Sequence, residues 1–503
     1  MKYFIVVMLF VCLITGISAN PVTKQLQEIL DKGVDLVLER EKIYDIDATL
    51  QLKSRGQRIY TDDVTRIEDF ATLRVVNPEL VTILNAEGLA GIAVKNIRFD
   101  GNRHNLRPKD GIVAMVPFIS MGKKGGDDQA IENCIITNAR CSGGWAAIHV
   151  HEYAFRTVIQ NNIIFASGVD VLGNGRSPLE YPFGWGDGIS VAARNSIVRN
   201  NLIVDAADEG VMVQGAPGTI VENNVVVALS REMLGGIALF DPTDYCLLDS
   251  VENTFDYRGV EVRNNLVDAL GARVHIGFPC GMNVWKLNKD NRIIVGARVI
   301  NNKMIGKAGG YGFAAGGIKD FVITGNINQA VFEGRGDGLP NNPPDEAAAF
   351  IFEPSSTPGC KLQKEFKPAQ KSNVPLLRVS RTPANEAGYR LLENYGEIEA
   401  EAIVSAAYME ILGRFPKKTE ALHWQKWLHK TRSNADAVRT VLMLSPEFIE
   451  GNPNWRATQL QECRADLFMQ QLYKAFKKVG SESWPSAFDL HHIIFSKYNQ
   501  NTN

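Results

Sequence analysis

Two carboxylates occupy equivalent places in a repeated strand pattern, and a third lies beside one of them. Asp187 precedes Gly-Ile-Ser-Val, and Glu209, which follows Asp208, precedes Gly-Val-Met-Val. Parallel strands lie about 4.8 Å apart, so stacking would bring these carboxylates close together. Two carboxylates at that distance repel each other, and one of them should hold its proton more tightly. Such a pair can supply the acid and the base of glycosidic cleavage. An Asp before Gly-Ile is also typical of tight turns.

The same alternation places further polar and aromatic side chains on one outward strip of the molecule. One outward row is expected to contain His149, Ser190, Met212 and His275. The next outward row is expected to contain His151 and Gln214. Beside these rows lie Trp145, Trp185 and Arg273. Taken one at a time, the histidines are typical solvated surface residues, and the tryptophans are typical packing residues under loops. Gathered on one strip, they favour a binding surface.

This combination of side chains suits a sugar polymer, because aromatic rings stack on sugar faces and carboxylates act as acid and base. Alternatively, the three carboxylates bind Ca²⁺, which would acidify a uronate C5 proton for removal by Arg273 or a histidine. The predicted catalytic residues are therefore Asp187, Asp208, Glu209, His149, His275 and Arg273, and the predicted substrate-binding residues are Trp145, Trp185, His151 and Gln214. No other metal site is expected.

The strands that must position these residues belong to an internal repeat. A phrase of apolar residues around one or two asparagines recurs at Asn96, Asn133, Asn161, Asn200, Asn223, Asn264 and Asn301, and Gly325 takes the same place in a last copy. Its spacing varies between 23 and 41 residues, as expected for coils with loop insertions. Such repetition is typical of a solenoid. We expect three short strands per coil, parallel from coil to coil, and stacked asparagine amides that hydrogen-bond along a ladder.

These repeats resemble the right-handed parallel β-helix proteins of the pectin-lyase-like superfamily over roughly residues 45–350. The positions of Asp187 and of the adjacent Asp208 and Glu209 resemble those of polygalacturonase-type glycoside hydrolases. That resemblance implies hydrolysis with inversion. The chain departs from the family's Asn-Thr-Asp and Gly-His-Gly motifs, where it has Trp-Gly-Asp at 185–187 and Gly-Gly-Ile at 235–237. The missing motifs, with nearby His and Arg, favour lyase or epimerase chemistry.

The predicted organisation is a β-helix over residues 20–350, a Pro-rich linker over 351–395 and a small all-α domain over 396–503. Helices are expected at 397–412, 434–444 and 458–478. Residues 406–448 resemble a small helical domain of unknown function found near the ends of secreted bacterial proteins. The matching residues are Tyr408, Leu412, Gly413, Arg414, Trp424 and the run Ser445 to Phe448. Trp424, Trp427 and Phe448 are interpreted as the core of that domain.

Residues 1–19 read as a cleaved signal peptide, with Lys2 before an apolar run that is too short to span a bilayer. The protein is thus expected to be secreted and not membrane-spanning. Six of the seven cysteines lie beyond the signal, and an oxidising compartment would permit disulfides. The formal net charge of −2 gives no reason to expect a nucleic-acid partner. Lys123 and Lys124 are interpreted as part of an exposed loop.

The sequence therefore predicts a monomeric, secreted carbohydrate-active protein that cleaves or modifies a pectin-like or alginate-like polysaccharide. Hydrolase, lyase and epimerase chemistry all remain open, with Ca²⁺ as the one cofactor to consider. The alternative is a non-catalytic protein whose β-helix binds glycans or forms an adhesion rod, and whose helical domain attaches it to a surface.

Overall fold

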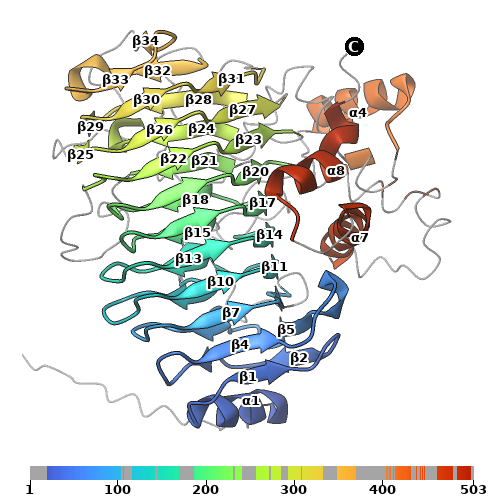
Figure 1. Ribbon diagram of the computed structural model, residues 1–503. Helices are drawn as coiled ribbons and strands as arrows, with labels where there is room; N and C mark the ends of the chain where they lie inside the picture. The colour runs from blue at the N-terminus through green and yellow to red at the C-terminus, as the bar shows by residue number, and fades with distance from the viewer. Residues whose placement is uncertain are drawn as a thin grey trace, which may run out of the picture.

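The computed structural model shows three long β-sheets stacked coil by coil along one axis, with helices at one end and along one side (Figure 1). The described residues are 20–102, 106, 116–141, 145–168, 186–229, 233–240, 256–270, 274–284, 293–306, 309–331, 348–369, 404–405, 407–408, 412, 414–431, 438, 442, 445, 447, 462–479 and 484–499. The signal peptide predicted for residues 1–19 lies outside them.

Each coil of the chain contributes one strand to each of three sheets, here called A, B and C, and the strands pair in parallel. Sheet A contains β1 (Leu36–Leu38), β4 (Arg58–Thr61), β7 (Ala93–Lys95), β10 (Ala130–Glu132), β13 (Val158–Gln160), β16 (Ile197–Arg199), β19 (Ile220–Glu222), β22 (Glu261–Arg263), β26 (Arg298–Ile300), β30 (Val322–Thr324) and β33 (Lys361–Leu362). Sheet B contains β2 (Ile43–Ile46), β5 (Ala71–Val75), β8 (Ile97–Asp100), β11 (Ile135–Thr137), β14 (Ile163–Phe165), β17 (Leu202–Val204), β20 (Val225–Val227), β23 (Leu266–Ala269), β27 (Lys303–Gly306) and β31 (Ile327–Asn328). Sheet C contains β3 (Leu50–Gln51), β6 (Leu84–Asn85), β9 (Ile119–Met121), β12 (Trp145–Val150), β15 (Gly186–Val191), β18 (Glu209–Val213), β21 (Met233–Leu239), β24 (Val274–Cys280), β28 (Gly309–Ala315), β32 (Phe350–Phe352) and β34 (Lys367–Pro368). A further pair, β25 (Ile294–Val295) and β29 (Ile318–Lys319), stands apart from these sheets.

Apolar stacks fill the space between the three sheets. Within one coil, Ile131, Ile136 and Ile148 point inward from sheets A, B and C, and all three are completely buried. Because the strands pair in register, Ile136 stacks on Ile164, and Ile164 stacks on Ile203 in the next coil. The expected three-stranded coils and the continuous apolar core are thus confirmed, and the fold is a parallel β-helix.

The paired asparagines of the repeat have two different roles at the bend between sheets A and B. The first asparagine takes a left-handed backbone, with φ of 57° at Asn161 and 55° at Asn200, and Gly325 takes φ of 69° in the copy that lacks it. Asn and Gly tolerate this conformation better than other residues. The second asparagine is buried and forms the expected ladder, in which Asn162 Nδ2 donates to Asn201 Oδ1 at 3.0 Å and Asn201 Nδ2 donates to Asn224 Oδ1 at 2.9 Å. These bonds hold successive coils at one spacing.

A short helix closes the N-terminal end of the core. Helix α1 (Pro21–Asp31) begins after Asn20, whose Oδ1 accepts a hydrogen bond from Val22 N at 3.0 Å. Its buried side chains, Leu26 and Leu30, cover the first coil. Gln27 exchanges two hydrogen bonds with the backbone of Gln51, at 2.9 and 3.0 Å, and so satisfies the exposed edge of sheet C.

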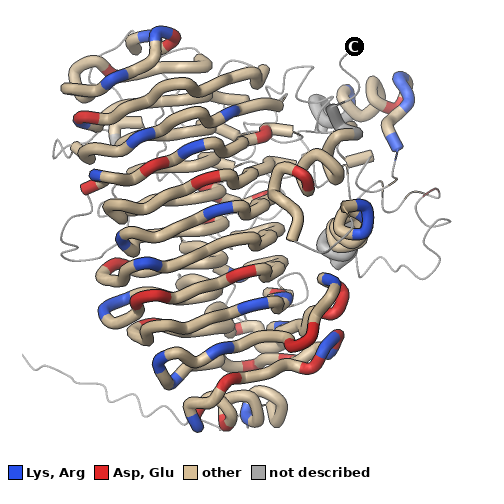
Figure 2. Tube along the Cα trace, viewed as in Figure 1, with Lys and Arg blue, Asp and Glu red and all other residues tan. Residues whose placement is uncertain are grey.

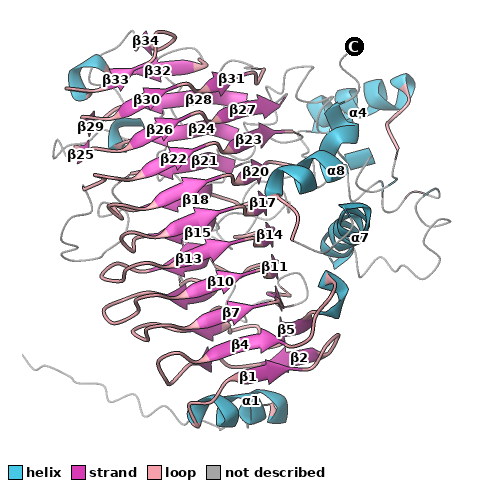
Figure 3. Ribbon diagram, in the orientation of Figure 1, coloured by secondary structure: helices cyan, strands magenta, loops and turns pink. Residues whose placement is uncertain are grey.

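The outer face of sheet B is also apolar, and C-terminal helices cover it. Helices α7 (Glu462–Val479) and α8 (Ala487–Asn499) lie along this face (Figure 3). The buried cluster between sheet and helices contains Ile163, Phe165, Leu202, Val204, Val225 and Leu266 from the strands, and Phe468, Leu472, Phe476, Leu490 and Phe495 from the helices. Phe165 and Phe468 stack with ring centroids 4.5 Å apart. This explains why strands β14, β17 and β20 are apolar on both faces.

The observed boundaries differ from the expected ones. Strands β33 and β34 continue sheets A and C to Pro368, so the solenoid extends into residues 351–395, which the sequence assigned to a linker. Of the helices, the one expected at 458–478 corresponds to α7, whereas α8 and α4 (Lys418–Thr431) were not expected. Most of residues 397–412 and 434–444 lies outside the described part of the chain.

The described cysteines form no disulfide, and the described charged residues form no single patch in the view of Figure 2. Cys134, Cys141, Cys280 and Cys360 are free thiols, and Cys134, Cys141 and Cys280 are buried, so the described residues form no disulfide. Basic and acidic residues are interspersed along the coils (Figure 2). Within the described residues, none of the helices has both the length and the apolar character needed to cross a bilayer.

Candidate active site

A bend in the strands of sheet C sets the position of the candidate carboxylates. Gly188, Gly210 and Gly236 turn toward the core at this bend. A Cβ at Gly188 would lie 2.5 Å from Gly210 O, and one at Gly210 would lie 2.7 Å from Gly236 O. No side chain fits there, which explains the glycine in each copy of the pattern. Asp187 and Glu209 come directly before these glycines, on the outer face.

The three predicted carboxylates lie together in this place. Asp187, Asp208 and Glu209 each offer a carboxyl oxygen, and these oxygens all lie within 4.8 Å of one another. The residues are 1%, 8% and 3% exposed, respectively. Across the next strand pair, Glu209 faces Gly235, where a Cβ would lie 2.8 Å from Glu209 Cγ. Glycine at 235 therefore leaves the room that the Glu209 side chain occupies.

Asp187 is the best anchored of the three carboxylates. Its Oδ2 accepts a hydrogen bond from Ser190 Oγ at 2.6 Å, and its Oδ1 accepts one from Glu209 N at 3.1 Å. Ser167 Oγ also donates to the Asp187 carbonyl oxygen at 2.6 Å. These bonds fix the carboxylate against strand β18, so that its distance from Glu209 depends little on side-chain rotation.

Burial and crowding raise the pKa of all three carboxyls. Burial raises the pKa of Asp208 to about 6. The pKa of Asp187 rises well above its ordinary value, first through burial and then through the charge of Asp208. The pKa of Glu209 rises well above its ordinary value through burial and through the charges of both neighbours. The three carboxyls therefore lose their protons in succession as the pH rises, and Asp208 loses its proton near pH 6.

A second polar cluster lies on the neighbouring strand β12, around two predicted histidines. His149 pairs with Ser190 across the strands, which confirms their shared row, and Ser190 pairs with Met212. The rings of His149 and His151 lie 4.4 Å apart, and the Trp145 ring lies 4.7 Å from His149. Through Ser190, this aromatic group adjoins the anchored carboxylate of Asp187.

His151 contacts a small polar network of Glu87, Ser120 and Lys123, whose role the sequence analysis did not predict. Glu87 Oε1 lies 3.2 Å from His151 Nε2 and accepts a hydrogen bond from Ser120 Oγ at 2.5 Å, while Lys123 Nζ lies 2.6 Å from Glu87 Oε2. Burial opposes ionisation of Glu87, but its hydrogen bonds with His151, Lys123 and Ser120 outweigh that effect and lower its pKa to about 2. Ser120 pairs with His149, so the strand alternation that revealed the histidines could have found it. Lys123 is exposed, as expected.

His149 has no such support. Its Nδ1 atom is buried without a hydrogen-bond partner, and the residue is 5% exposed. Burial, followed by the charge of His151, lowers its pKa well below the ordinary value, so the ring is neutral at pH 7. A buried polar atom without a partner costs about 1–3 kcal/mol in a folded protein. That cost marks His149 as a candidate for contact with a bound molecule.

The structure corrects the predicted place of His275. Met233 pairs with Val274 and Gly235 pairs with Ile276, so His275 lies opposite Leu234 and not in the row of His149. The row of Met212 continues instead through Ala238. The expected row is wrong because the inward glycine of strand β24 is Gly277, which lies two residues after His275 and sets the register of this strand. His275 thus lies in the row of Asp208, two coils further on.

The other predicted residues have mixed outcomes. Gln214 shares the row of His151, because Ala192 N donates to Val150 O and Gln214 N donates to Val191 O. Trp145 pairs with Gly186 at the start of β15. Trp185 and Arg273 lie outside the described residues, so their predicted roles stay predictions.

The carboxylate cluster also fits the ligand chemistry of Ca²⁺. Calcium binds carboxylate oxygens at about 2.3–2.6 Å, so two of its ligand atoms lie up to about 5 Å apart. The three carboxyl oxygens, all within 4.8 Å, meet this requirement. Asp187, Asp208 and Glu209 would hold the ion.

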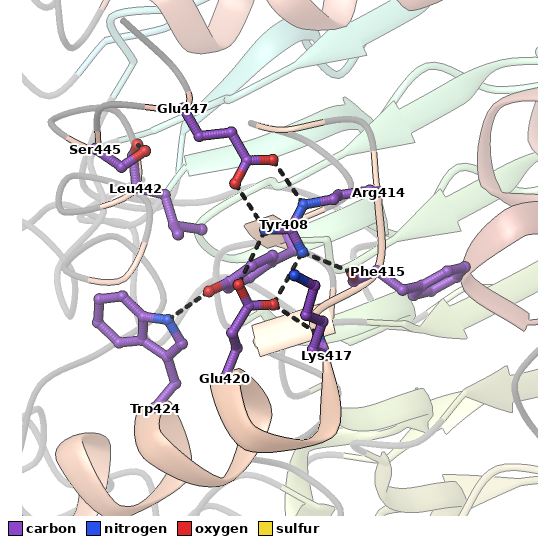
Figure 4. Close-up of polar contacts among 9 residues, drawn as sticks. All are labelled: Tyr408, Arg414, Phe415, Lys417, Glu420, Trp424, Leu442, Ser445 and Glu447. Atoms are coloured by element: carbon purple, nitrogen blue, oxygen red, sulfur yellow. Dashed lines mark hydrogen bonds and ion pairs between the residues drawn. The ribbon is translucent and has the colours of Figure 1, made fainter.

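The motif residues of the C-terminal helical region form a structural network. Arg414 donates to both oxygens of Glu447, at 2.6 and 2.7 Å, and to both oxygens of Glu420, at 2.9 and 3.0 Å (Figure 4). Trp424 Nε1 donates to Tyr408 Oη at 2.9 Å, and Trp424 is buried as expected. The two carboxylates raise the pKa of Arg414, so the network stays charged. These contacts link separate segments and point to a role in folding.

Comparisons with known proteins give only distant similarities. No family model matches the chain, and no curated protein matches its sequence. A mannuronan C-5 epimerase A-module from Azotobacter vinelandii is 14% identical, with a TM-score of 0.32 over 68% of this chain and 94% of its own. An alginate lyase from Paenibacillus is 16% identical, with a TM-score of 0.33 over 62% of this chain and 96% of its own. A tailspike protein of E. coli bacteriophage HK620 is 10% identical, with a TM-score of 0.41 over 71% of this chain and 60% of its own.

The three parallel sheets themselves define the class of protein. The chain is a parallel β-helix protein with C-terminal helices. Because a fold of this kind hosts many unrelated activities, function must be argued from the residues on its surface.

Proposed function

We propose that this chain is a secreted carbohydrate-active enzyme that cleaves or modifies an acidic polysaccharide, pectin-like or alginate-like. The observation that carries the proposal is the cluster of Asp187, Asp208 and Glu209, whose buried carboxyl oxygens all lie within 4.8 Å of one another. Strongly raised carboxyl pKa values are typical of functional sites. Export is proposed from the apolar run at 3–17, and a monomer is the proposed state.

The cluster supports proton transfer at neutral pH. Asp208, with a pKa of about 6, is mostly ionised at pH 7 and serves as a base. Glu209, whose pKa is raised well above its ordinary value, is the candidate acid that donates a proton to a glycosidic oxygen. Acid and base of opposite protonation, held side by side, are the requirement for general acid–base catalysis of glycan cleavage.

The spacing of the carboxyls bears on the type of reaction. Inverting glycosidases separate their two carboxyls by roughly 6.5–9.5 Å, to leave room for water between them. The oxygens here lie within 4.8 Å. The geometry therefore favours a lyase, an epimerase or a retaining hydrolase over the inverting hydrolysis that the polygalacturonase resemblance implies.

His149 and Trp145 give the proposed site its second half. The neutral imidazole of His149 lies on the strand next to Ser190 and Asp187, and its unpartnered Nδ1 is a candidate acceptor for a sugar proton. The partly buried Trp145 ring offers a surface for a sugar face. A Ca²⁺ ion held by the three carboxylates would bind the uronate carboxylate and acidify its C5 proton.

A second candidate function is glycan binding without catalysis. The observation that favours it is the burial of the carboxylates, because the most exposed of them, Asp208, is only 8% exposed. In that case the cluster would be a proton-sharing element of the fold.

The experiment that tests the proposal is a product assay on full-length protein. Purified protein would be incubated with pectate, alginate and neutral glycans, with and without EDTA. New reducing ends alone indicate a hydrolase, absorbance from an unsaturated uronate indicates a lyase, and a change in uronate composition by NMR indicates an epimerase. Absence of every product, with glycan binding retained, would overturn the enzyme proposal in favour of the second candidate.

A further inference from the structure

A cavity of about 480 Å³ lies away from sheet C, where the turns between sheets A and B meet the C-terminal helices. Its wall combines Phe70, next to strand β5, with Phe476 and Lys477 near the end of α7 and with Trp484 before α8. Asn96 and Asn133, from the turns after β7 and β10, also line it, together with residues 64–68, which include Arg66 and Glu68. The proposed activity uses none of these residues.

One side of the cavity is aromatic. Trp484 is partly exposed and lies between two phenylalanines. Its ring is nearly parallel to that of Phe70, at 14° and 6.1 Å between centroids, and meets that of Phe476 edge-on at 5.0 Å. Phe70 and Phe476 are each 6% exposed, so they fix the orientation of the tryptophan. A rigid aromatic wall presents apolar contact area at low cost in side-chain entropy.

The other side is the open end of a ladder of side-chain amides. Asn200 Nδ2 donates to Asn161 Oδ1 at 2.6 Å, Asn161 Nδ2 donates to Asn133 Oδ1 at 3.1 Å, and Asn133 Nδ2 donates to Asn96 Oδ1 at 3.4 Å. At the far end, Asn200 Oδ1 accepts a hydrogen bond from Ala487 N, in the first turn of α8, at 2.6 Å.

All of these amides therefore donate in one direction, toward the cavity. The last donor, Asn96 Nδ2, has no acceptor among the described residues. Aligned amide hydrogen bonds polarise one another, so this terminal donor is the strongest of the row. Lys477 adds a cation to the rim, and no ion pair links it to another described residue.

We propose that this cavity binds a pyranose unit of a glycan, as a second site separate from the carboxylate cluster. A pyranose has a face of C–H groups, which fits the aromatic side, and hydroxyl groups at its edge, which fit the amide end. The volume of about 480 Å³ is within the range of small-ligand sites. The site lets the protein hold one part of a glycan chain apart from the strip on sheet C.

The experiment measures binding of defined trisaccharides to the full-length protein by titration calorimetry. One trimer is neutral, cellotriose, and two are acidic, trigalacturonate and trimannuronate. Asn96→Asp keeps the side-chain oxygen that accepts from Asn133 and keeps the left-handed backbone, but it removes the Nδ2 donor. This variant should bind whichever of the three trimers the wild type binds about fivefold to tenfold more weakly. Lys477→Gln should weaken an acidic trimer about threefold and leave a neutral one unchanged.

Asn301→Asp is the matched control. Asn301 has the same left-handed backbone, with φ of 55°, in a later coil, and it does not line the cavity. The proposal predicts wild-type affinity for this variant. Absence of binding by all three trimers at millimolar concentration overturns the proposal, and so does binding that Asn96→Asp leaves unchanged. The same titration with Asp208→Asn distinguishes a failure of the cavity proposal from a failure of the proposed activity. This variant alters the carboxylate cluster and should bind the trimers at the cavity as the wild type does.

Discussion

The outer faces of sheets B and C are both buried, but their chemistry is opposite. On sheet B, residues such as Leu202 and Val225 lie under α7 and α8 and form an apolar interface. On sheet C, the buried outer residues include Asp187, Ser190 and His149. Burial of apolar side chains stabilises a fold, whereas burial of crowded carboxyls costs free energy. The same repeated coil therefore stabilises the fold through apolar burial on sheet B, whereas on sheet C it holds buried carboxyls close together at a cost in free energy.

The largest expected effect is a loss of activity, and it should follow a substitution on sheet C but not one on sheet B. Asp208→Asn removes the base without changing the size of the side chain, and the rate should fall about 10²-fold to 10⁴-fold. Leu202→Ala on sheet B should leave the rate of the folded protein unchanged. Steady-state kinetics on the polysaccharide that the product assay identifies would measure both. Equal loss of rate in the two variants would remove the distinction between the faces.

The next effect concerns a buried contact between a histidine and a carboxyl that joins sheet B to helix α8. His491 Nε2 lies 2.8 Å from Asp268 Oδ2, and the two residues are 8% and 0% exposed. His491→Ala leaves the Asp268 carboxylate buried without this partner and should lower the free energy of unfolding by about 3–5 kcal/mol. Chemical denaturation provides the measurement.

A double variant sharpens that result. With Asp268→Asn also in place, the cost of His491→Ala should shrink to about 1 kcal/mol, because no buried charge remains. A cost that stays the same in both backgrounds would show that the histidine acts by packing alone.

The apolar interface itself should respond to a cavity. Leu472 on α7 is fully buried against sheet B, and Leu472→Ala should lower the free energy of unfolding by about 2–4 kcal/mol. Lys474→Ala, on the exposed side of the same helix, is the control and should change it by less than about 0.5 kcal/mol. If Leu472→Ala leaves thermal unfolding unchanged, the helices do not cover sheet B in solution.

The last effect is the pH dependence of stability that sheet C imposes. The pKa of Asp208 is about 6 in the folded protein and about 3.8 when unfolded, so the folded state holds the proton more tightly. Its contribution to stability is full below pH 4 and is lost as the pH rises through 6, by about 3 kcal/mol in all. Asp208→Asn should therefore be more stable than wild type at pH 8 and equal to it at pH 4. Equal stability of the two proteins at pH 8, measured by thermal unfolding in EDTA, would contradict this.

The sequence predicts the fold because the repeat depends on asparagine and glycine at positions where few other residues fit the backbone. Asparagine pairs at left-handed turns and glycines at an inward bend are backbone requirements, so they reveal the coil and place Asp187 beside Glu209. Strands with three consecutive apolar residues, such as Leu202–Val204, also signal a second covered face. That signal is explained by the docking of α7 and α8, whereas the sequence analysis assigned these helices to a small all-α domain.

The rest of the site could not be predicted for a physical reason. Glu87 lies in an early coil whose turn lacks the asparagine phrase, so no pattern aligns it with His151, two coils later. His275 was placed in the wrong row because a glycine bend shifts the register, and only strand pairing shows where the bend lies. Asparagine and glycine report backbone geometry, whereas contacts between side chains of different coils depend on the lengths of the loops between them.

The raised pKa values of Asp187, Asp208 and Glu209 predict that part of this cluster on sheet C is still protonated at neutral pH. Infrared difference spectroscopy of the EDTA-treated protein, titrated from pH 5 to pH 8, observes the protonated carboxyl stretch directly. The account predicts that this band persists at pH 7 in the wild type and is reduced in Glu209→Gln. A wild-type spectrum without any protonated carboxyl at pH 7 would contradict the account.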